Sequence, residues 1–151
     1  MKIKFYVVLG IFALLVLSGC SQQKQPEKIY PTNEVKDFVI ISLDKINNDK
    51  TEHKYEIYNS GKYTSSLINP NKQENKNEGQ LAEADLSYLK SLVQNKEFNS
   101  IPPYMEGAGQ DCTITIIKTN FNDQEKTNRA ESCASTPDAF NNVVAAIEKL
   151  K

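Results

Sequence analysis

Residues 112–133 read CTITIIKTNFNDQEKTNRAESC, and they contain the most informative β-hairpin pattern of the 151-residue chain. The segment Cys112–Thr119 is rich in β-branched residues and predicts a strand. The segment Gln124–Cys133 predicts a polar return strand near the edge of a sheet. Between them, Asn122 and Asp123 tolerate the backbone angles that a tight turn requires. The stretch therefore predicts an antiparallel hairpin that begins and ends with a cysteine.

The two cysteines of this hairpin are expected to form a disulfide. Facing residues of an antiparallel pair have residue numbers with a constant sum, and Phe121–Gln124 and Cys112–Cys133 both sum to 245. Counted from a hydrogen-bonded pair at the turn, the cysteines form a non-hydrogen-bonded pair. The Cα atoms of such a pair lie about 4.5 Å apart, which a disulfide accepts. A bulge near Ile116-Ile117 would shift this count. Two buried free thiols are the alternative, but an oxidising compartment favours the disulfide.

Two segments have the apolar periodicity of amphipathic helices. In Thr136–Leu150, Thr136 is a candidate N-cap and Pro137 suits the first turn. The apolar stripe of this segment comprises Phe140, Val143, Val144, Ile147 and Leu150. The segment Glu83–Lys96 has a comparable stripe, and the two prolines beyond its end prevent its continuation. Both segments are therefore expected to pack one face against a core.

A second hairpin is expected in the first half of the domain. The segment Glu52–Tyr58 alternates charged and apolar residues, and Lys62–Ile68 returns as its partner strand. Asn59-Ser60-Gly61 is a three-residue loop with glycine where a left-handed conformation is required. This loop length places Ile57 opposite Tyr63.

The remaining segments complete a predicted α+β fold. The apolar segment Val35–Leu43 predicts a strand. Three segments predict loops: Asp44–Lys50, Asn69–Gln80 and Met105–Asp111. A short strand ending at Leu81 could follow from the loop Asn69–Gln80. Along the chain the order is strand, hairpin, helix, hairpin, helix. Residues 34–151 are therefore expected to form a single domain, with an antiparallel sheet of about five strands and two helices packed on one face.

The N-terminal segment has the features of an export signal. Lys2 and Lys4 precede an apolar run, Phe5–Leu17, which ends in Leu17-Ser18-Gly19-Cys20. These last four residues resemble the lipobox of bacterial lipoprotein precursors. The apolar run is shorter than the roughly 20 residues that a membrane-spanning helix needs. The resemblance implies that residues 1–19 are removed as a signal peptide and that Cys20 is lipidated, with palmitate among the acyl chains. An ordinary secretory signal is the alternative.

Lipidation of Cys20 would anchor the protein to a membrane without spanning it, because two acyl chains suffice for stable attachment. Ser21 follows the cysteine, and in a host with two membranes this pattern implies the periplasmic face of the outer membrane. In other hosts the outer face of the cell membrane is expected. Residues 20–33 are polar, contain two prolines, and predict a tether between the lipid and the domain.

The composition of the expected mature chain limits its function. Removal of residues 1–19 would leave 132 residues, with 16 basic and 19 acidic side chains. This length suits one domain with a real core. A mildly acidic surface disfavours nucleic acid as a partner, since nucleic-acid binding leaves a basic footprint. The composition does not indicate an oligomeric state.

The sequence contains no recognisable catalytic constellation. His53 is the only histidine and lies on a predicted strand, where a half-exposed surface imidazole is expected. A histidine-based zinc site would need a second histidine, and no G-x-S-x-G motif accompanies a serine nucleophile. The carboxylate pairs Glu83/Asp85 and Asp123/Glu125 lie among mixed charges, where their pKa values have little reason to shift. We therefore expect no enzyme activity, metal or cofactor.

One loop is a candidate for partner binding. It comprises Glu106, Gly107, Ala108, Gly109, Gln110 and Asp111. Its glycines suit either a backbone nest for an anion or a flexible connection into the following strand. Tyrosines, which make effective protein contacts, are numerous in the chain: Tyr30, Tyr55, Tyr58, Tyr63, Tyr88 and Tyr104.

The second half of the chain has a further resemblance. From Leu86 to Leu150 the sequence contains a leucine-rich helix, a phenylalanine, prolines, a G-A-x-x-D loop, an alternating strand, a polar return strand and a closing helix. This order is similar to that of the emfourin group, small bacterial inhibitors of thermolysin-like metallopeptidases. The extra hairpin, the lipobox and the paired cysteines depart from that group.

These observations predict a lipid-anchored, non-enzymatic binding module of the cell envelope. Its expected partners are the membrane, through Cys20, and an envelope or secreted protein. An emfourin-like protease inhibitor is the first alternative. A structural envelope lipoprotein, or a small hydrolase without a recognisable motif, is the second.

Overall fold

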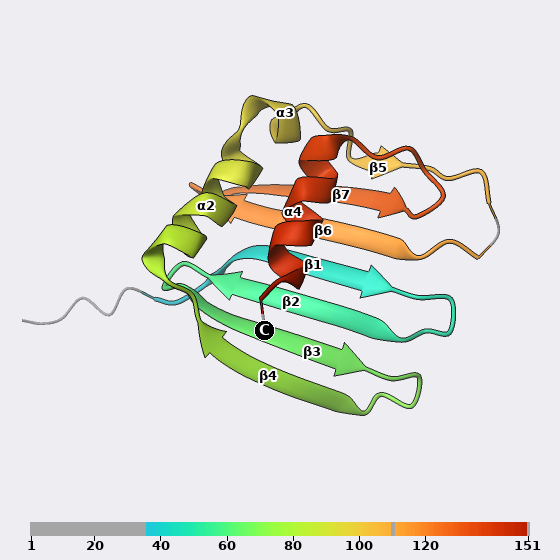
Figure 1. Cartoon of the computed structure of the whole chain (residues 1–151), viewed down its shortest axis with the longest axis horizontal. Helices are drawn as coiled ribbons and strands as arrows, with labels where there is room; N and C mark the ends of the chain where they lie inside the picture. The colour runs from blue at the N-terminus through green and yellow to red at the C-terminus, as the bar shows by residue number, and fades with distance from the viewer. Residues whose placement is uncertain (1–35, 110, 151) are drawn as a thin grey trace, which may run out of the picture. The chain divides into compact units, whose positions relative to one another are not determined.

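The hairpin that contains the cysteines forms the strands Ile114–Phe121 (β6) and Gln124–Glu131 (β7). Its register runs without a shift from Phe121↔Gln124 to Ile114↔Glu131, which confirms the constant sum of 245. Asn122 and Asp123 have φ values of 52° and 60°, the left-handed conformations of a tight hairpin turn. The computed structural model describes residues 36–109 and 111–150 (Figure 1).

The second hairpin has the predicted boundaries, Glu52–Tyr58 (β2) and Lys62–Ile68 (β3). Ile57 faces Tyr63, as the loop length predicts. Gly61 has a φ of 84°, and a Cβ atom there would lie 2.8 Å from the Gln80 side chain. The local sequence around this turn therefore determines both its conformation and the register of its strands.

The central strand is longer at its C-terminal end than the sequence indicates. It spans Val39–Ile46 (β1) and pairs with β2 on one side and β6 on the other. Asp44 was expected in a loop, but it lies within β1, opposite Lys54 of β2 and Ile116 of β6. Backbone pairing on both sides extends the strand past the polar residue, which a search for apolar runs does not detect.

A strand that the sequence assigns to a loop lies at one edge of the sheet. Glu74–Gln80 (β4) pairs with β3 along its whole length, from Lys62↔Gln80 to Ile68↔Glu74. Its side chains are almost all exposed, so the strand has no apolar face from which it could be recognised. Backbone hydrogen bonds to β3, rather than side-chain burial, hold it in place. The expectation of a loop over Asn69–Gln80 is correct only for its first residues, which form the turn into β4. The short strand allowed before Leu81 is present as β4, which is seven residues long and ends at Gln80.

The helices are Glu83–Gln94 (α2), Lys96–Asn99 (α3) and Asp138–Glu148 (α4). The expected first helix ends early because Asn95 interrupts it and caps α3, with Phe98 N donating to Asn95 Oδ1 at 2.6 Å. At α4, Pro137 rather than Thr136 is the N-cap residue. The Thr136 hydroxyl donates instead to Asn141 Oδ1 at 2.8 Å. The predicted capping role of Thr136 is therefore wrong.

A two-residue strand, Tyr104–Met105 (β5), pairs parallel to β7 and makes the sheet mixed. Met105 was expected in a loop, and so short a strand has no pattern of its own. The buried Asn128 side chain holds the preceding segment, because its Nδ2 atom donates to Ile101 O at 3.1 Å and to Pro102 O at 2.9 Å.

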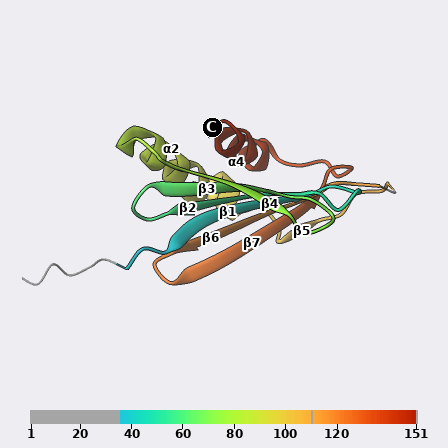
Figure 2. The ribbon, with the colours of Figure 1, turned by 90° about the horizontal axis from the view of Figure 1, so that it is seen from below.

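In the described residues the strand order is β4-β3-β2-β1-β6-β7-β5. Helices α2 and α4 lie on one face of the sheet, as expected (Figure 2). The α+β class is confirmed, but seven strands in a mixed sheet and three helices replace the expected five antiparallel strands and two helices. The core lies between the sheet and the helices and includes Ile41, Leu43, Ile57, Leu89, Val93, Phe98, Ile117, Phe140, Val143 and Ile147. Among the helices described, none is long and apolar enough to cross a membrane.

Candidate functional site

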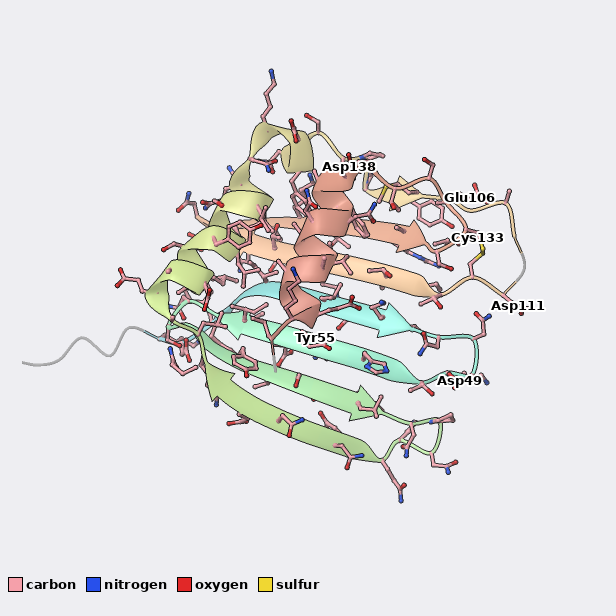
Figure 3. All side chains as sticks on the ribbon, viewed as in Figure 1. Asp49, Tyr55, Glu106, Asp111, Cys133 and Asp138 are labelled. Carbon is pink, nitrogen blue, oxygen red and sulfur yellow. A yellow bond between two sulfur atoms is a disulfide. The ribbon has the colours of Figure 1, made fainter. Side chains whose placement is uncertain are left out.

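The predicted disulfide joins Cys112 to Cys133, with 5.7 Å between the Cα atoms (Figure 3). The distance exceeds the 4.5 Å expected for a non-hydrogen-bonded strand pair because β6 and β7 end before the cysteines, at Ile114 and Glu131. Ser132 N donates to Thr113 O at 2.8 Å and continues the pairing towards the bridge. The disulfide therefore closes the open end of the hairpin.

The candidate binding loop packs directly against this disulfide. A Cβ atom at Gly107 would lie 2.8 Å from Cys133 Cβ, and one at Gly109 would lie 2.8 Å from Cys133 Sγ. Both positions therefore need glycine because the backbone approaches the bridge closely. This contact places the loop at the hairpin end. Gln110 lies outside the described residues.

The carboxylate of Glu131 accepts hydrogen bonds from Tyr104 and from the candidate binding loop. Tyr104 donates its hydroxyl proton to Glu131 Oε1 at 2.6 Å, and Gly107 N donates to Oε2 at 3.1 Å. These bonds, the Tyr104 bond first, hold the pKa of Glu131 below its usual value. The same hydrogen bond raises the pKa of Tyr104. Because Glu131 already occupies the Gly107 amide, this amide does not serve an anion nest.

Next to the loop lies an exposed patch that combines an aromatic ring with charges of both signs. Tyr104 is 44% exposed, and the guanidinium carbon of Arg129 lies 5.2 Å from the centre of its ring. Arg129 is itself within 4.0 Å of Glu131. Together with Glu106, these residues form what we call the Tyr104–Arg129 patch. Tyrosine and arginine are the residue types that most often dominate protein–protein binding energy.

The loop between β1 and β2 contacts the candidate binding loop. Asn48 donates its side-chain amide to the carbonyl of Asp111. In the same loop Asp49 accepts a hydrogen bond from Thr51 N at 2.9 Å, and this backbone bond lowers the pKa of Asp49. Figure 3 shows Asp49, Glu106, Asp111 and Cys133 at the same end of the sheet.

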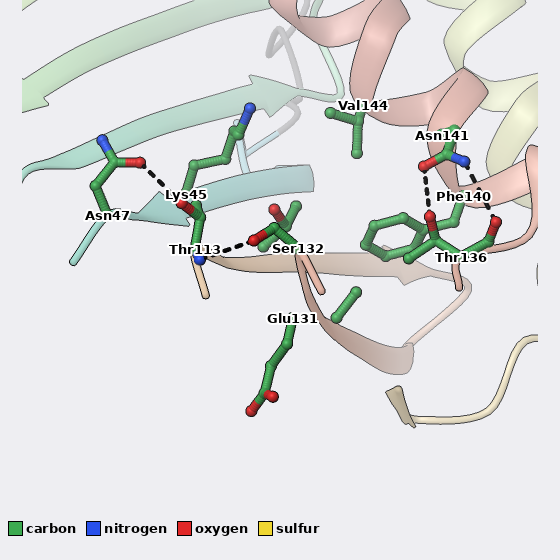
Figure 4. Close-up of a pocket in the computed structure, with 11 residues that line it drawn as sticks. Lys45, Asn47, Thr113, Glu131, Ser132, Thr136, Phe140, Asn141 and Val144 are labelled. Atoms are coloured by element: carbon green, nitrogen blue, oxygen red, sulfur yellow. Dashed lines mark hydrogen bonds between the residues drawn. The ribbon is translucent and has the colours of Figure 1, made fainter. Parts of the chain in front are cut away.

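A hollow of about 360 Å³ lies between this end of the sheet and α4 (Figure 4). Its polar groups bond mainly to one another. Thr113 N donates to Ser132 Oγ at 3.0 Å, and Asn141 Nδ2 donates to Thr136 O at 3.3 Å. At its side, Lys45 forms an ion pair with Glu148 at 2.6 Å. Within the described part of the chain, no group of three or more His, Cys, Asp or Glu residues could hold a metal ion.

The residues considered for acid–base chemistry lie apart in the fold. His53 is half-buried on β2, between Lys45 of β1 and Leu67 of β3. The pair Glu83/Asp85 is exposed in the first turn of α2. The pair Asp123/Glu125 is exposed at the turn between β6 and β7. The fold does not bring these groups together into one site.

A buried carboxylate that the sequence does not reveal lies on the sheet face opposite the helices. Asp44 is only 9% exposed, and its Oδ1 atom is buried with no hydrogen-bond partner among the described residues. Burial raises the pKa of Asp44, while the positive charge of Lys118, 4.0 Å away, opposes this shift. Neighbouring Lys54 and Glu56 form an ion pair at 2.7 Å. Strands β2 and β6 flank Asp44 on both sides of β1.

The lipobox, Cys20 and the tether lie outside the described residues. No protein-family model matches the chain, and no curated protein matches it either.

Proposed function

We propose that this protein is a lipid-anchored, non-enzymatic binding module of the bacterial cell envelope, and that the Tyr104–Arg129 patch contacts its protein partner. The sequence Leu17-Ser18-Gly19-Cys20 supports the anchor. The acyl chains on Cys20 would hold the protein to a membrane. The patch is the observation that carries the binding role.

The patch is preorganised, which lowers the entropic cost of binding. Tyr104 is fixed by its hydrogen bond to Glu131 and by its backbone pairing with Arg129. The disulfide holds the neighbouring loop in place. An aromatic ring and a guanidinium that are exposed but already ordered lose little freedom on contact with a partner.

The patch lies at the end of the sheet opposite the start of β1. The described domain begins near the start of β1, at Val39, whereas the disulfide lies at the opposite end of the sheet. A strand of eight residues separates these ends by about 25 Å. If Cys20 is at the membrane, the extended thirteen-residue stretch Ser21–Asn33 would allow a further distance of about 45 Å between the membrane and the domain.

Co-purification from envelopes tests the binding role. The full-length chain is isolated from its host membranes with mild detergent, and stoichiometric partners are identified by mass spectrometry. Tyr104→Ala and Arg129→Ala should each lower partner recovery at least tenfold, because truncation of a hot-spot residue of these types costs about 2 kcal/mol or more. Tyr88→Ala is the matched control, since Tyr88 is 57% exposed but lies on α2.

If the Tyr88 variant loses the partner and the Tyr104 variant retains it, the patch is not the contact surface. Absence of any stoichiometric partner would instead support a purely structural envelope lipoprotein.

An emfourin-like inhibitor is the second candidate. It is favoured by the segment Glu106–Gly109, whose two glycines lie against the Cys112–Cys133 disulfide. A loop that is held in its bound conformation loses less freedom on binding a protease. Titration of a thermolysin-like metallopeptidase with the full-length chain in detergent distinguishes the two proposals. Stoichiometric inhibition that is lost on reduction of Cys112–Cys133 supports the inhibitor, and unchanged peptidase activity excludes it.

A further inference from the structure

The strand β4 forms an edge of the sheet at which a further strand can pair. It is the last strand in the order on its side, and Figure 1 shows it clear of α2 and α4. Its seven residues have no positive φ angle and no register shift against β3. An edge of this length and regularity presents a continuous row of backbone groups to its surroundings.

The backbone groups that point outward can be assigned from two hydrogen bonds. Asn69 N donates to Gln73 O at 3.0 Å, and Leu81 N donates to Gly61 O at 2.9 Å. Hydrogen-bonded pairs alternate along an antiparallel ladder, so the odd-numbered residues of β4 bond to β3. The N–H and C=O groups of the even-numbered residues therefore point away from the sheet: Glu74, Lys76, Glu78 and Gln80.

We propose that a second copy of this chain pairs antiparallel with β4, in the register centred on Asn77. In this register each Lys76 lies opposite Glu78 of the other copy, and each Glu74 lies opposite Gln80. All seven residues of both strands overlap, and every outward backbone group meets its counterpart. The two sheets then form one continuous sheet across the dimer.

The charges of β4 select this register over its neighbours. Centring the pair on Lys76 or on Glu78 would place identical charges directly opposite each other, which is unfavourable. Centring it on Asn75 keeps one kind of opposite-charge pair but shortens the overlap. Charged edge strands commonly prevent association, whereas this arrangement is self-complementary in its longest register.

The charged side chains of β4 lie together on one face of the sheet, where those of a second copy can meet them. These side chains lie on the same face as Thr64 and Ser66, opposite the helices. Lys76 and Lys62 already lie 3.0 and 3.2 Å from Glu78 within one copy. Lys76 of the second copy would join this exposed group from across the dimer axis.

Cysteine substitution tests both the dimer and its register. Asn77 would face itself across the axis as a non-hydrogen-bonded pair, with Cα atoms about 4.5 Å apart, within disulfide range. Asn75 would lie four residues out of register with itself, at about 14 Å, beyond that range. Both asparagines are exposed and lie on the same face of β4, so Asn75→Cys is a matched control.

The full-length chain is expressed in its host and oxidised mildly, with the unsubstituted chain in parallel as a control for Cys20. Asn77→Cys should give a reducible species of twice the monomer mass, at least tenfold more abundant than with Asn75→Cys. No cross-link at position 77, or equal cross-linking at 75 and 77, would overturn the proposal.

Charge reversal provides a second test in the Asn77→Cys chain. Lys76→Glu should reduce cross-linking several-fold because it places two glutamates opposite each other. Adding Glu78→Lys restores opposite charges and should restore the cross-link. If the double reversal stays as weak as the single one, or if the single reversal has no effect, the register is wrong. Retention of the Cys112–Cys133 disulfide confirms folding in each variant.

Discussion

Glu131 links three parts of the candidate site at the scale of single residues. Its two carboxylate oxygens accept hydrogen bonds from Tyr104 and from the Gly107 amide, and Arg129 lies nearby. A strand residue thereby orders an exposed tyrosine and a loop at the same time. The charged form of Glu131 accepts these bonds, so the order of the patch depends on its protonation.

We predict that part of the protein's stability is lost in acid because of Glu131. Its folded-state pKa is held below the ordinary value of 4.5, so the folded state binds the proton less tightly than the unfolded state. The stabilisation is therefore complete above pH 4.5 and disappears as the pH falls through the lower folded-state pKa. Urea unfolding at several pH values should show this loss in the wild type.

Glu131→Gln retains the shape of the side chain but cannot ionise. Its unfolding midpoint should fall below that of the wild type at pH 7 and converge with it in acid. Equal pH dependence in the two proteins would show that Glu131 does not contribute to it.

At the scale of elements, the hairpin β6–β7 depends on its covalent link. The return strand β7 has few apolar side chains, so packing specifies its register only weakly. The disulfide lies at the end opposite the turn and connects the hairpin to the segment that leads into α4. Turn and bridge together constrain both ends of a strand that buries little apolar surface.

Replacement of either cysteine should therefore destabilise the protein by about 2–5 kcal/mol. The reason is that the bridge, which spans a sequence separation of 21, restricts the unfolded chain. Thermal unfolding of Cys112→Ala, and of the Cys112→Ala/Cys133→Ala double variant, measures the effect. An unchanged melting temperature, or labelling of both thiols by alkylation of the native unreduced protein, would contradict this account.

At the scale of the whole molecule, the sheet has two different faces and two different ends. One face carries α2 and α4 over the apolar core, while the other exposes charged strand residues around the buried Asp44. The start of β1 lies at one end, and the disulfide and the Tyr104–Arg129 patch lie towards the other.

Membrane attachment should depend on Cys20 alone. Because two acyl chains are needed for stable attachment and the sulfur of Cys20 would carry the first lipid, Cys20→Ser should abolish palmitate incorporation. Metabolic labelling with radioactive palmitate measures this. Cys112→Ala is the matched control, since Cys112 is paired with Cys133. Label that persists in the Cys20→Ser chain would contradict lipidation at this position.

Local sequence by itself determined the hairpins, the class of the fold and the disulfide. Asn59-Ser60-Gly61 and Asn122-Asp123 specify their turns through residues that accept left-handed angles, and the turns then fix the strand registers. The sum of 245 placed Cys112 opposite Cys133, because the residue numbers of facing residues in an antiparallel pair have a constant sum. Each of these features depends on neighbours within about twenty residues.

Only the tertiary structure decided the two outermost strands, the burial of Asp44 and the composition of the patch. β4 and β5 have no recognisable side-chain pattern, since backbone pairing with a neighbouring strand is what makes each of them a strand. Asp44 is buried because β2 and β6 flank it, and Tyr104 meets Arg129 because β5 docks beside β7. These contacts join segments that are distant in the chain, so their energies depend on the assembled sheet.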